Sequence, residues 1–227
     1  MSEIKVLNHG LVRLVEHMGS DLSIVRAARV SYDAEWRAGE DEGKDAKLID
    51  YLVKNRHTSP FECVTFTFEV RAPIFVLRQW HRHRTQSYSE ISARYSELPE
   101  EFYIPEVSQI TTQAKGNKQM RTHDIHPHAE AFQAAVADQC AAAFEVYKRL
   151  LKAGMPRELA RGVLPMNTFS HMFTTVSLHN LSHFLSLRLH EHAQYEIRVY
   201  AQAMLDLIEP IVPVAVAALK KHRLDAK

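Results

Sequence analysis

The sequence predicts an α+β fold: one domain in which an antiparallel-containing sheet is flanked by long helices. Residues 63–71 (C-V-T-F-T-F-E-V-R) alternate strictly between apolar and polar side chains, which is typical of a strand with one buried face. The alanine-rich stretch 129–152 and the stretch 190–208 instead repeat apolar residues at helical spacing. With 227 residues, of which 46% are hydrophobic, the chain can bury one sizeable core, so we expect a single domain over 1–227.

The N-terminal half is predicted to mix strands and helices. Residues 4–18 alternate loosely, which favours one or two strands. A helix follows, with Ser20 or Asp21 as its N-cap and Ser31 at its end. The other elements of this half are, in order, a flexible loop at 33–45, a helix at 46–55, a turn at 57–62, the strand at 63–71, a helix at 73–82 opened by Pro73, and a loop lined with donors at 85–95.

The C-terminal half is predicted to be mainly helical. Residues 98–104 are aromatic and fit a short strand or a loop, while residues 105–127 are polar and predict a mobile excursion. Residues 167–176 are β-branched and aromatic, which fits either a helix or a strand. The other elements are, in order, a helix at 129–152 ended by Gly154, a short helix from Pro156 with Arg157 and Arg161 one turn apart, a helix at 178–188 capped by Ser177, a helix at 190–208 ended by Pro210, and a short helix from Pro213 to 223.

Charge and composition exclude several classes of protein. The chain carries 28 Lys and Arg against 27 Asp and Glu, so its positive charge is local rather than global. No apolar run has the length of a signal peptide core or a membrane span, so we expect a cytoplasmic protein without membrane contact. The two cysteines, Cys63 and Cys140, are far apart and lack metal-ligand spacing. They indicate a reducing compartment and two small buried thiols.

Fourteen histidines raise the question of a metal site. His123, His126 and His128 are close in sequence, but a proline separates two of them and no carboxylate-bearing helix follows. His179 and His183 stand at i,i+4 spacing, which suits zinc, yet the E-x-x-H partners and a third ligand are missing. We therefore predict no metal, and a histidine-metal hydrolase is the rival that bound zinc would support.

Positive charge gathers between residues 78 and 95, R-Q-W-H-R-H-R-T-Q-S-Y-S-E-I-S-A-R-Y. Four arginines accompany several serines and a single carboxylate, Glu90. Arginine presents a planar fork of donors that matches phosphate and carboxylate, and serine hydroxyls add to such a cradle. Because the whole chain is nearly neutral, this segment favours one small anionic ligand. A solvated basic surface and a nucleic-acid-binding module that uses these arginines are the alternatives.

The same segment resembles the signature of the flavin-dependent thymidylate synthases, R-H-R-x-x-S-x-x-x-x-S-x-R. It is present here from Arg82 to Arg94, and Ser89 stands where many members of that family carry Asn. Further stretches that resemble blocks of the family are A-A-R-V-S-Y at 27–32, H-T-S-P-F-E at 57–62, P-I-F-V-x-R-Q-W at 73–80, P-R-E-x-A-R-x-V-L-P at 156–165, and F-L-x-L-R with H-A-Q at 184–194. Together they extend over most of residues 24–205.

This resemblance implies a reaction and its reagents. The family methylates dUMP reductively to dTMP, with 5,10-methylenetetrahydrofolate as carbon donor and an FAD-borne hydride that NAD(P)H renews. It implies an FAD-dependent methyltransferase without an enzyme nucleophile, in keeping with two cysteines that lack an activating surrounding. It also implies a homotetramer whose active sites are shared between chains.

The resemblance also assigns residues. Arg188 is implied to be catalytic, stabilising negative charge on the pyrimidine, although the end of a helix is also where an arginine serves as a simple C-terminal cap. His57 is implied to lie near the flavin and the folate. The residues implied to bind dUMP are Gln79, Arg82, Glu90, Ser92, Arg94, Arg161 and Arg188. Those implied at the FAD site are Ser59, Arg82, His83, Arg84 and Glu90, together with Ser177, His179 and His183, where relatives often carry Asn or Arg.

Overall fold

The strand predicted from strict alternation lies at the centre of a five-stranded antiparallel sheet. The structure, a computed structural model, describes residues 3–224. Helices and antiparallel strands together confirm the predicted α+β fold class. In spatial order the strands are β1 (Glu3–Val6), β2 (Gly10–Met18), β3 (Thr65–Pro73), β7 (Phe169–Ser177) and β4 (Ser87–Glu90).

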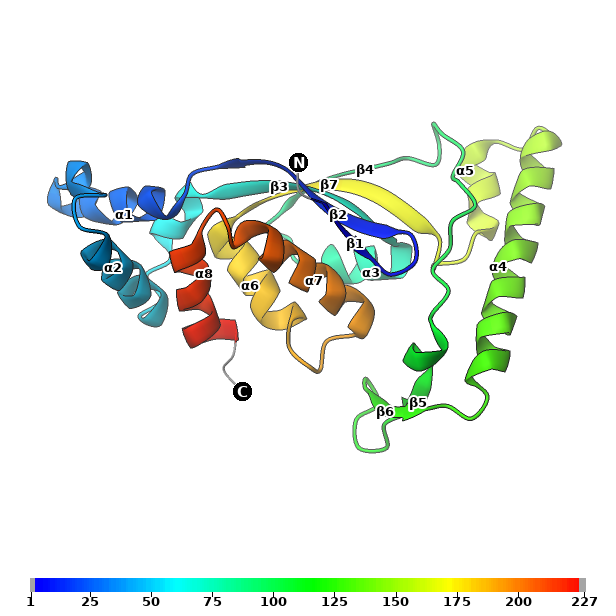
Figure 1. Cartoon of the computed structure of the whole chain (residues 1–227). Helices are drawn as coiled ribbons and strands as arrows, with labels where there is room; N and C mark the ends of the chain where they lie inside the picture. The colour runs from blue at the N-terminus through cyan, green and yellow to red at the C-terminus, as the bar shows by residue number, and fades with distance from the viewer. Residues whose placement is uncertain (1–2, 225–227) are drawn as a thin grey trace.

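One face of this sheet is apolar and covered by helices. On β3, Phe66, Phe68 and Val70 are fully buried, as their period of two predicts. They belong to the main hydrophobic core, whose helical side chains include Phe184 and Tyr200. The helices that form this cover are α3 (Ile74–Trp80), α6 (Leu178–Arg188) and α7 (Tyr195–Ile208) (Figure 1).

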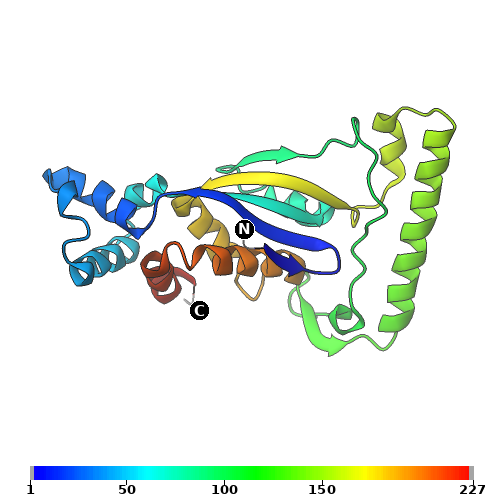
Figure 2. The same ribbon diagram turned by 45° about the horizontal axis from the view of Figure 1, so that its top comes forward.

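The other helices extend the molecule at its two ends (Figure 2). One end carries α1 and α2, and the opposite end carries the long helix α4 with α5. Helix α4 packs against its own small core, which is separate from the main one and includes Phe102, Phe144 and Tyr147. The helices at the two ends are α1 (Asp21–Arg29), α2 (Glu42–Lys54), α4 (Ala129–Lys152) and α5 (Arg157–Ala160). Helix α8 (Pro213–Leu219) instead lies between α2 and α7 and continues as a π turn over Lys220–Leu224.

The prediction of a loop at 85–95 was wrong for its first half. Ser87–Glu90 forms β4, whose partners on β7 run from Met172 to Thr175. Serines favour irregular structure when only local hydrogen bonds compete. Here an edge of the sheet offers main-chain partners from a distant part of the chain, and these partners override the local preference. The undecided segment 167–176 is the strand β7 that supplies them.

The segment 105–127, for which the sequence predicts only a polar, mobile excursion, contains regular structure. The segment contains a two-stranded hairpin made of β5 (Thr111–Gln113) and β6 (Arg121–Ile125). Its threonines are close across the hairpin, with the hydroxyls of Thr112 and Thr122 2.6 Å apart. The polar composition misled the prediction because the strands are short and largely exposed, so they lack an apolar alternation.

Two helix starts differ from the prediction, and each has a local cause. Helix α2 begins at Glu42 rather than 46 because the Asp41 carboxylate accepts a hydrogen bond from the Lys44 amide at 3.0 Å. The helix predicted over 190–208 begins only at Tyr195, because the preceding residues form a turn after α6. At the N-terminal helix the structure selects Ser20 as the N-cap.

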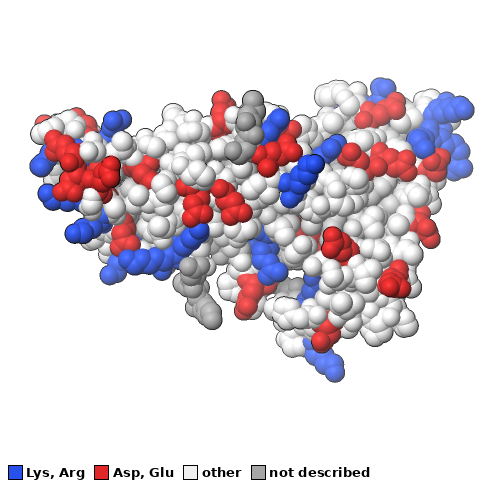
Figure 3. All heavy atoms as spheres, viewed as in Figure 1, with Lys and Arg blue, Asp and Glu red and all other residues white. Residues whose placement is uncertain are grey.

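Charges of both signs are interleaved on the face shown in Figure 3. Basic side chains are interrupted there by acidic ones along the whole length of the molecule. No helix within residues 3–224 has the length and apolar composition that a bilayer span requires. Within the same residues, no group of three or more His, Cys, Asp or Glu side chains is arranged to hold a metal ion.

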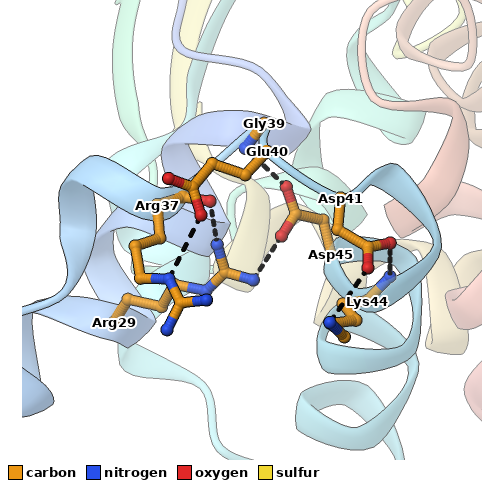
Figure 4. Close-up of polar contacts among 7 residues, drawn as sticks. All are labelled: Arg29, Arg37, Gly39, Glu40, Asp41, Lys44 and Asp45. Carbon is orange, nitrogen blue, oxygen red and sulfur yellow. Dashed lines mark hydrogen bonds and ion pairs between the residues drawn. The ribbon is translucent and has the colours of Figure 1, made fainter.

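A partly buried ion pair anchors the loop that joins α1 to α2 (Figure 4). The Arg29 guanidinium donates to the Asp45 carboxylate at 2.5 Å, and the second oxygen of that carboxylate accepts from the Gly39 amide at 2.7 Å. Arg29 also donates to the main-chain oxygen of Arg37. Gly39 has a φ of +92°, a conformation that favours glycine. Arg29 is the arginine of the A-A-R-V-S-Y block, so this block has a structural role in holding the loop.

The two cysteines differ in their surroundings. Cys140 is buried in the small core beneath α4, as predicted, and its sulfur accepts a hydrogen bond from Asn167 at 3.0 Å. Cys63 is exposed at the end of a 3₁₀ turn (Ser59–Cys63), so the prediction of a buried thiol was wrong there. The turn places Cys63 before the first residue of β3, where the alternating burial has not yet begun.

Candidate active site

Arg188 is the best-anchored of the predicted site residues. It is the last residue of α6, yet its side chain crosses to α3 and the turn after it instead of capping its own helix. Its Nε donates to His83 Nε2 at 3.0 Å, and its Nη2 donates to the main-chain oxygen of Gln79 at 3.4 Å. Arg188, Gln79 and His83, which the resemblance implies at the dUMP and FAD sites, therefore meet in one place.

His83 accepts this hydrogen bond from a buried position. Only 8% of its surface is exposed, and its ring packs edge-on against Phe184 with centroids 4.8 Å apart. Burial, followed by electrostatic interactions with Arg188 and His183, lowers the pKa of His83 to about 4. The imidazole is therefore neutral near pH 7 and has a lone pair available for Arg188. Burial also lowers the pKa of Arg188.

The signature segment is held in place by buried polar contacts around Trp80, which is fully buried. The Trp80 indole donates to the side-chain oxygen of Gln86 at 3.1 Å, and the Thr174 hydroxyl donates to the same oxygen at 3.0 Å. The Tyr88 hydroxyl donates to the main-chain oxygens of Trp80 and His83. Burial raises the pKa of Tyr88 to about 12. These contacts fix the turn that carries the arginines between α3 and β4.

A second group of predicted residues lies between β4 and α5. The Glu90 carboxylate accepts a hydrogen bond from the Ser170 hydroxyl at 2.5 Å. Arg94 and Arg161 meet at Glu158: Arg94 Nε lies 3.6 Å from its carboxylate, and Arg161 Nε donates to its main-chain oxygen at 3.4 Å. The hydroxyl of a further predicted residue, Ser92, accepts from the Arg94 amide at 3.3 Å.

A third group gathers around the start of α6. His57 and His179 line one shallow cleft, together with Arg56 and Arg223, two cations that the sequence analysis did not select. Ser177 is the N-cap of α6, because its hydroxyl accepts from the Asn180 amide at 3.4 Å. Two further predicted residues come from elements that pack together. Ser59 begins the 3₁₀ turn that contacts α6, and His183 is exposed on α6 itself.

The three groups do not share a cavity within the described residues. Arg82 and Arg84 are exposed on the turn after α3, outside each of the pockets found there. One cavity, of about 700 Å³, lies beside α4 and is lined by Tyr103, Arg121 and Glu196 among others, and by none of the predicted ligand residues. Within residues 3–224, a single copy of the chain therefore does not bring these ligand groups together in one of these pockets.

Two residues near these groups were not selected from the sequence. His81 Nε2 lies 3.9 Å from the Glu90 carboxylate, and its ring packs edge-on against Tyr88. The side chain of Gln194 accepts a hydrogen bond from Gln79 at 2.5 Å. Signals for both were present, because His81 lies two residues before His83 and Gln194 belongs to the H-A-Q block.

A buried polar network links the hairpin to the body of the molecule. Glu196 is 2% exposed, and one of its oxygens accepts hydrogen bonds from the Tyr103 hydroxyl at 3.0 Å and from Arg121 at 3.2 Å. Burial and the neighbouring carboxylate raise the pKa of Tyr103 far above its ordinary value. Arg121 comes from β6 and Glu196 from α7, so this network anchors the 105–127 segment beside Gln194.

Comparison with known proteins identifies the family. A family model described as "Thymidylate synthase complementing protein" matches residues 13–214. A flavin-dependent thymidylate synthase from Thermus thermophilus is 49% identical over 223 residues, which is 98% of this chain and 80% of that protein. The enzyme of the same description from Treponema denticola is 45% identical over 222 residues, 97% of this chain and 82% of that protein. A solved structure, the UMP/dUMP methylase PolB from Streptomyces cacaoi bound with 5-Br dUMP, matches with a TM-score of 0.87 at 37% identity and covers 97% of this chain and 99% of that one. The chain therefore belongs to the family of flavin-dependent thymidylate synthases.

Proposed function

We propose that this chain methylates dUMP reductively to dTMP, using 5,10-methylenetetrahydrofolate as carbon donor, FAD as the flavin and NAD(P)H as the source of reducing equivalents. Family membership supports the reaction class, and the crystallised relative bound to 5-Br dUMP supports the nucleotide substrate. The single observation that carries the proposal is the anchored guanidinium of Arg188, held at Nε and Nη2 beside the signature segment.

The residues present fit FAD, which supplies a hydride to the substrate carbon when bound. A dinucleotide needs cations for its pyrophosphate, and Arg82 and Arg84 are both exposed on the turn after α3. It also needs donors along its length, which Ser59, His179 and His183 supply from two neighbouring elements. Cofactor chemistry of this kind leaves binding, orientation and electrostatics to the protein.

The protein's own part begins with holding dUMP. We assign the phosphate and the sugar to the second group of residues, in which Ser170 donates to Glu90 and two arginines lie at Glu158. Arginine suits this task because its charge is permanent and its donor fork matches a phosphate. Glu90, which already accepts from the Ser170 hydroxyl, is an acceptor suited to the deoxyribose hydroxyl. The residues of this group are Glu90, Ser92, Arg94 and Arg161, and Gln79 and Arg82 complete the assigned set.

Arg188 then acts on the pyrimidine. Its guanidinium stabilises negative charge that develops on the ring, in the manner of an oxyanion hole. We assign no activated thiol for attack on the ring: Cys140, on α4, is buried in the small core, and Cys63 ends the 3₁₀ turn that precedes β3. His57, on the cleft with His179, is assigned to the vicinity of the flavin and the folate.

The dispersed ligand groups favour sites shared between copies of the chain. Within residues 3–224, the groups around Arg188, Glu158 and His179 do not line one of the pockets together. A ligand needs contacts on several sides to be held and shielded from water. We therefore propose a cytoplasmic homotetramer in which each active site combines groups from different chains.

The visible spectrum and turnover of the purified protein test the function directly. The protein as isolated is expected to be yellow, to bleach when NADPH is added without oxygen, and to form dTMP when dUMP and methylenetetrahydrofolate follow. A colourless protein that binds polynucleotides with a steep dependence on salt would instead support the nucleic-acid-binding module, which neither the family nor the mixed charges in Figure 3 favour.

The absence of a protein nucleophile gives a sharper prediction. Replacing Cys63 and Cys140 together by alanine is expected to leave kcat for dTMP formation within about threefold of the wild-type value, because neither thiol takes part in the reaction. Single Cys140→Ala serves as the control for stability, since this residue packs in the small core. A double variant that folds, holds its flavin and forms no dTMP would contradict the proposed reaction.

Arg84 gives a prediction about the flavin. Arg84→Ala is expected to weaken FAD binding by about tenfold to hundredfold, the usual value of one charge-assisted hydrogen bond to a phosphate. The measurement is the dissociation constant of FAD from quenching of flavin fluorescence on the apoprotein. Arg26→Ala is a matched control, because Arg26 is also exposed but lies on α1. Unchanged FAD affinity with lost dUMP binding would reverse the assigned role.

A further inference from the structure

The contact between Arg188 and His83 has a chemical direction. A guanidinium carries donors only, so Arg188 Nε must donate, and His83 Nε2 must accept with an unprotonated nitrogen. The remaining ring proton of a neutral imidazole then belongs on Nδ1. His83 is therefore committed to one tautomer, and the nitrogen that accepts from Arg188 is unavailable as a donor to another ligand.

We propose, on the basis of the function proposed above, that His83 is a positioning residue that orients the Arg188 guanidinium toward the pyrimidine of dUMP by accepting its Nε–H. This role uses Nε2 of a histidine that the family resemblance places at the FAD site. The two hydrogen bonds of Arg188, to His83 and to the Gln79 carbonyl, engage Nε and Nη2. They leave Nη1 outside the anchoring contacts, so that it is available for the substrate.

The choice of a neutral acceptor has a consequence for charge. Within residues 3–224, Arg188 forms no ion pair with a carboxylate, unlike Arg29 with Asp45 or Arg121 with Glu196. A carboxylate at the position of His83 would orient the guanidinium equally well but would cancel its charge toward an anionic substrate. A neutral imidazole orients the guanidinium and leaves its full positive charge for the reaction.

The histidine is itself held rigidly enough for this role. Its ring packs edge-on against Phe184, and its main-chain oxygen accepts from the Tyr88 hydroxyl at 2.8 Å. The titratable groups that face the ring are Arg188 and His183 from α6, with ring centroids of the two histidines 6.1 Å apart. Both neighbours disfavour a second proton on His83, which keeps the accepting lone pair free.

Two substitutions separate the acceptor from the ring. His83→Gln places an amide oxygen near the position of Nε2 and keeps an acceptor, whereas His83→Leu fills the space without one. For the FAD-loaded full-length protein, we expect His83→Leu to raise the dissociation constant of dUMP and to lower kcat, each by about tenfold to hundredfold, with flavin content unchanged. His83→Gln should recover most of both losses. In an Arg188→Ala background, adding His83→Leu should weaken dUMP binding no further, because the guanidinium to be positioned is gone.

Nitrogen-15 NMR of histidine-labelled wild-type protein gives a measurement that does not depend on any variant folding. We expect His83 to show an unprotonated Nε2 and a protonated Nδ1 throughout pH 5.5–8, a range above its pKa of about 4. A proton on Nε2, titration near pH 6.5, or a His83→Leu enzyme that binds dUMP normally would overturn the proposal. Loss of flavin in both variants would also overturn it and return His83 to the FAD site. A wild-type protein that neither binds dUMP nor forms dTMP would instead contradict the proposed function, which separates the two failures.

Discussion

Replacing Arg188 by alanine is expected to lower kcat for dTMP formation by about a thousandfold while the protein keeps its flavin and its fold. Removal of one preorganised donor that stabilises developing negative charge has an effect of this size in other enzymes. The side chain lies at the end of α6, half-buried, and its two anchoring contacts are to Gln79 and His83 rather than to core residues. Its loss should therefore affect the reaction much more than stability.

The measurement separates the steps of the reaction. Flavin content is read from the visible spectrum, dUMP affinity from calorimetry, and kcat from dTMP formation at saturating dUMP. Arg188→Lys keeps the positive charge but loses the donor fork, so it should recover only part of the activity. Arg26→Ala, an exposed arginine on α1, should behave as wild type. Full dTMP formation by Arg188→Ala would remove this residue from the catalytic role.

Replacing Arg121 by methionine is expected to destabilise the protein by about 3 kcal/mol, the lower end of the range for leaving a buried charge without its partner. The Glu196 side chain is 3% exposed and that of Arg121 34% exposed, so the carboxylate bears nearly all of the burial. Without the guanidinium, the Tyr103 hydroxyl alone would face Glu196, whose second oxygen has no partner within residues 3–224. A change of this size should lower the melting temperature by about 6–12 °C for a chain of this length.

Urea unfolding at one fixed protein concentration measures the effect, since stability of an oligomer depends on concentration. Adding Glu196→Gln to Arg121→Met should recover much of the loss, because a neutral amide no longer needs a cation. Arg198→Met is a matched control on α7, since that arginine donates only to the main-chain oxygen of Glu191 and should cost no more than about 1 kcal/mol. Equal stability of Arg121→Met and wild type would show that the hairpin is anchored by other contacts.

Elements with a strong local pattern were predictable. The alternation at 63–71 identified the central strand because one face of β3 is buried and the other is not. The helix α4 was predicted over its full length, Ala129–Lys152, because it is long and ends at a glycine with a positive φ. The strand β4 and the hairpin β5–β6 were missed because each is short and polar, and their hydrogen-bond partners lie on other strands.

The candidate site was likewise predictable only in part. The motifs named the arginines, serines and histidines and the family, but they did not indicate which side chains would meet. Arg188 contacts a histidine 105 residues earlier, Gln79 contacts a glutamine 115 residues later, and Glu90 contacts a serine 80 residues later. The contact in which His83 Nε2 accepts from Arg188, on which our proposed positioning role for this histidine is based, could not be read from the motif.

The sequence by itself determined the chemical inventory of this protein: a cluster of permanent cations on a nearly neutral chain, two thiols without an activating motif, and a signature shared with one enzyme family. Only the tertiary structure decided how these groups are arranged. It decided, for example, that the Arg188 guanidinium contacts the neutral His83, whereas the Arg121 guanidinium contacts the Glu196 carboxylate. The physical reason is that local patterns set the burial and backbone conformation of neighbouring residues, whereas the charge state and direction of a side chain depend on partners that folding brings from distant parts of the chain.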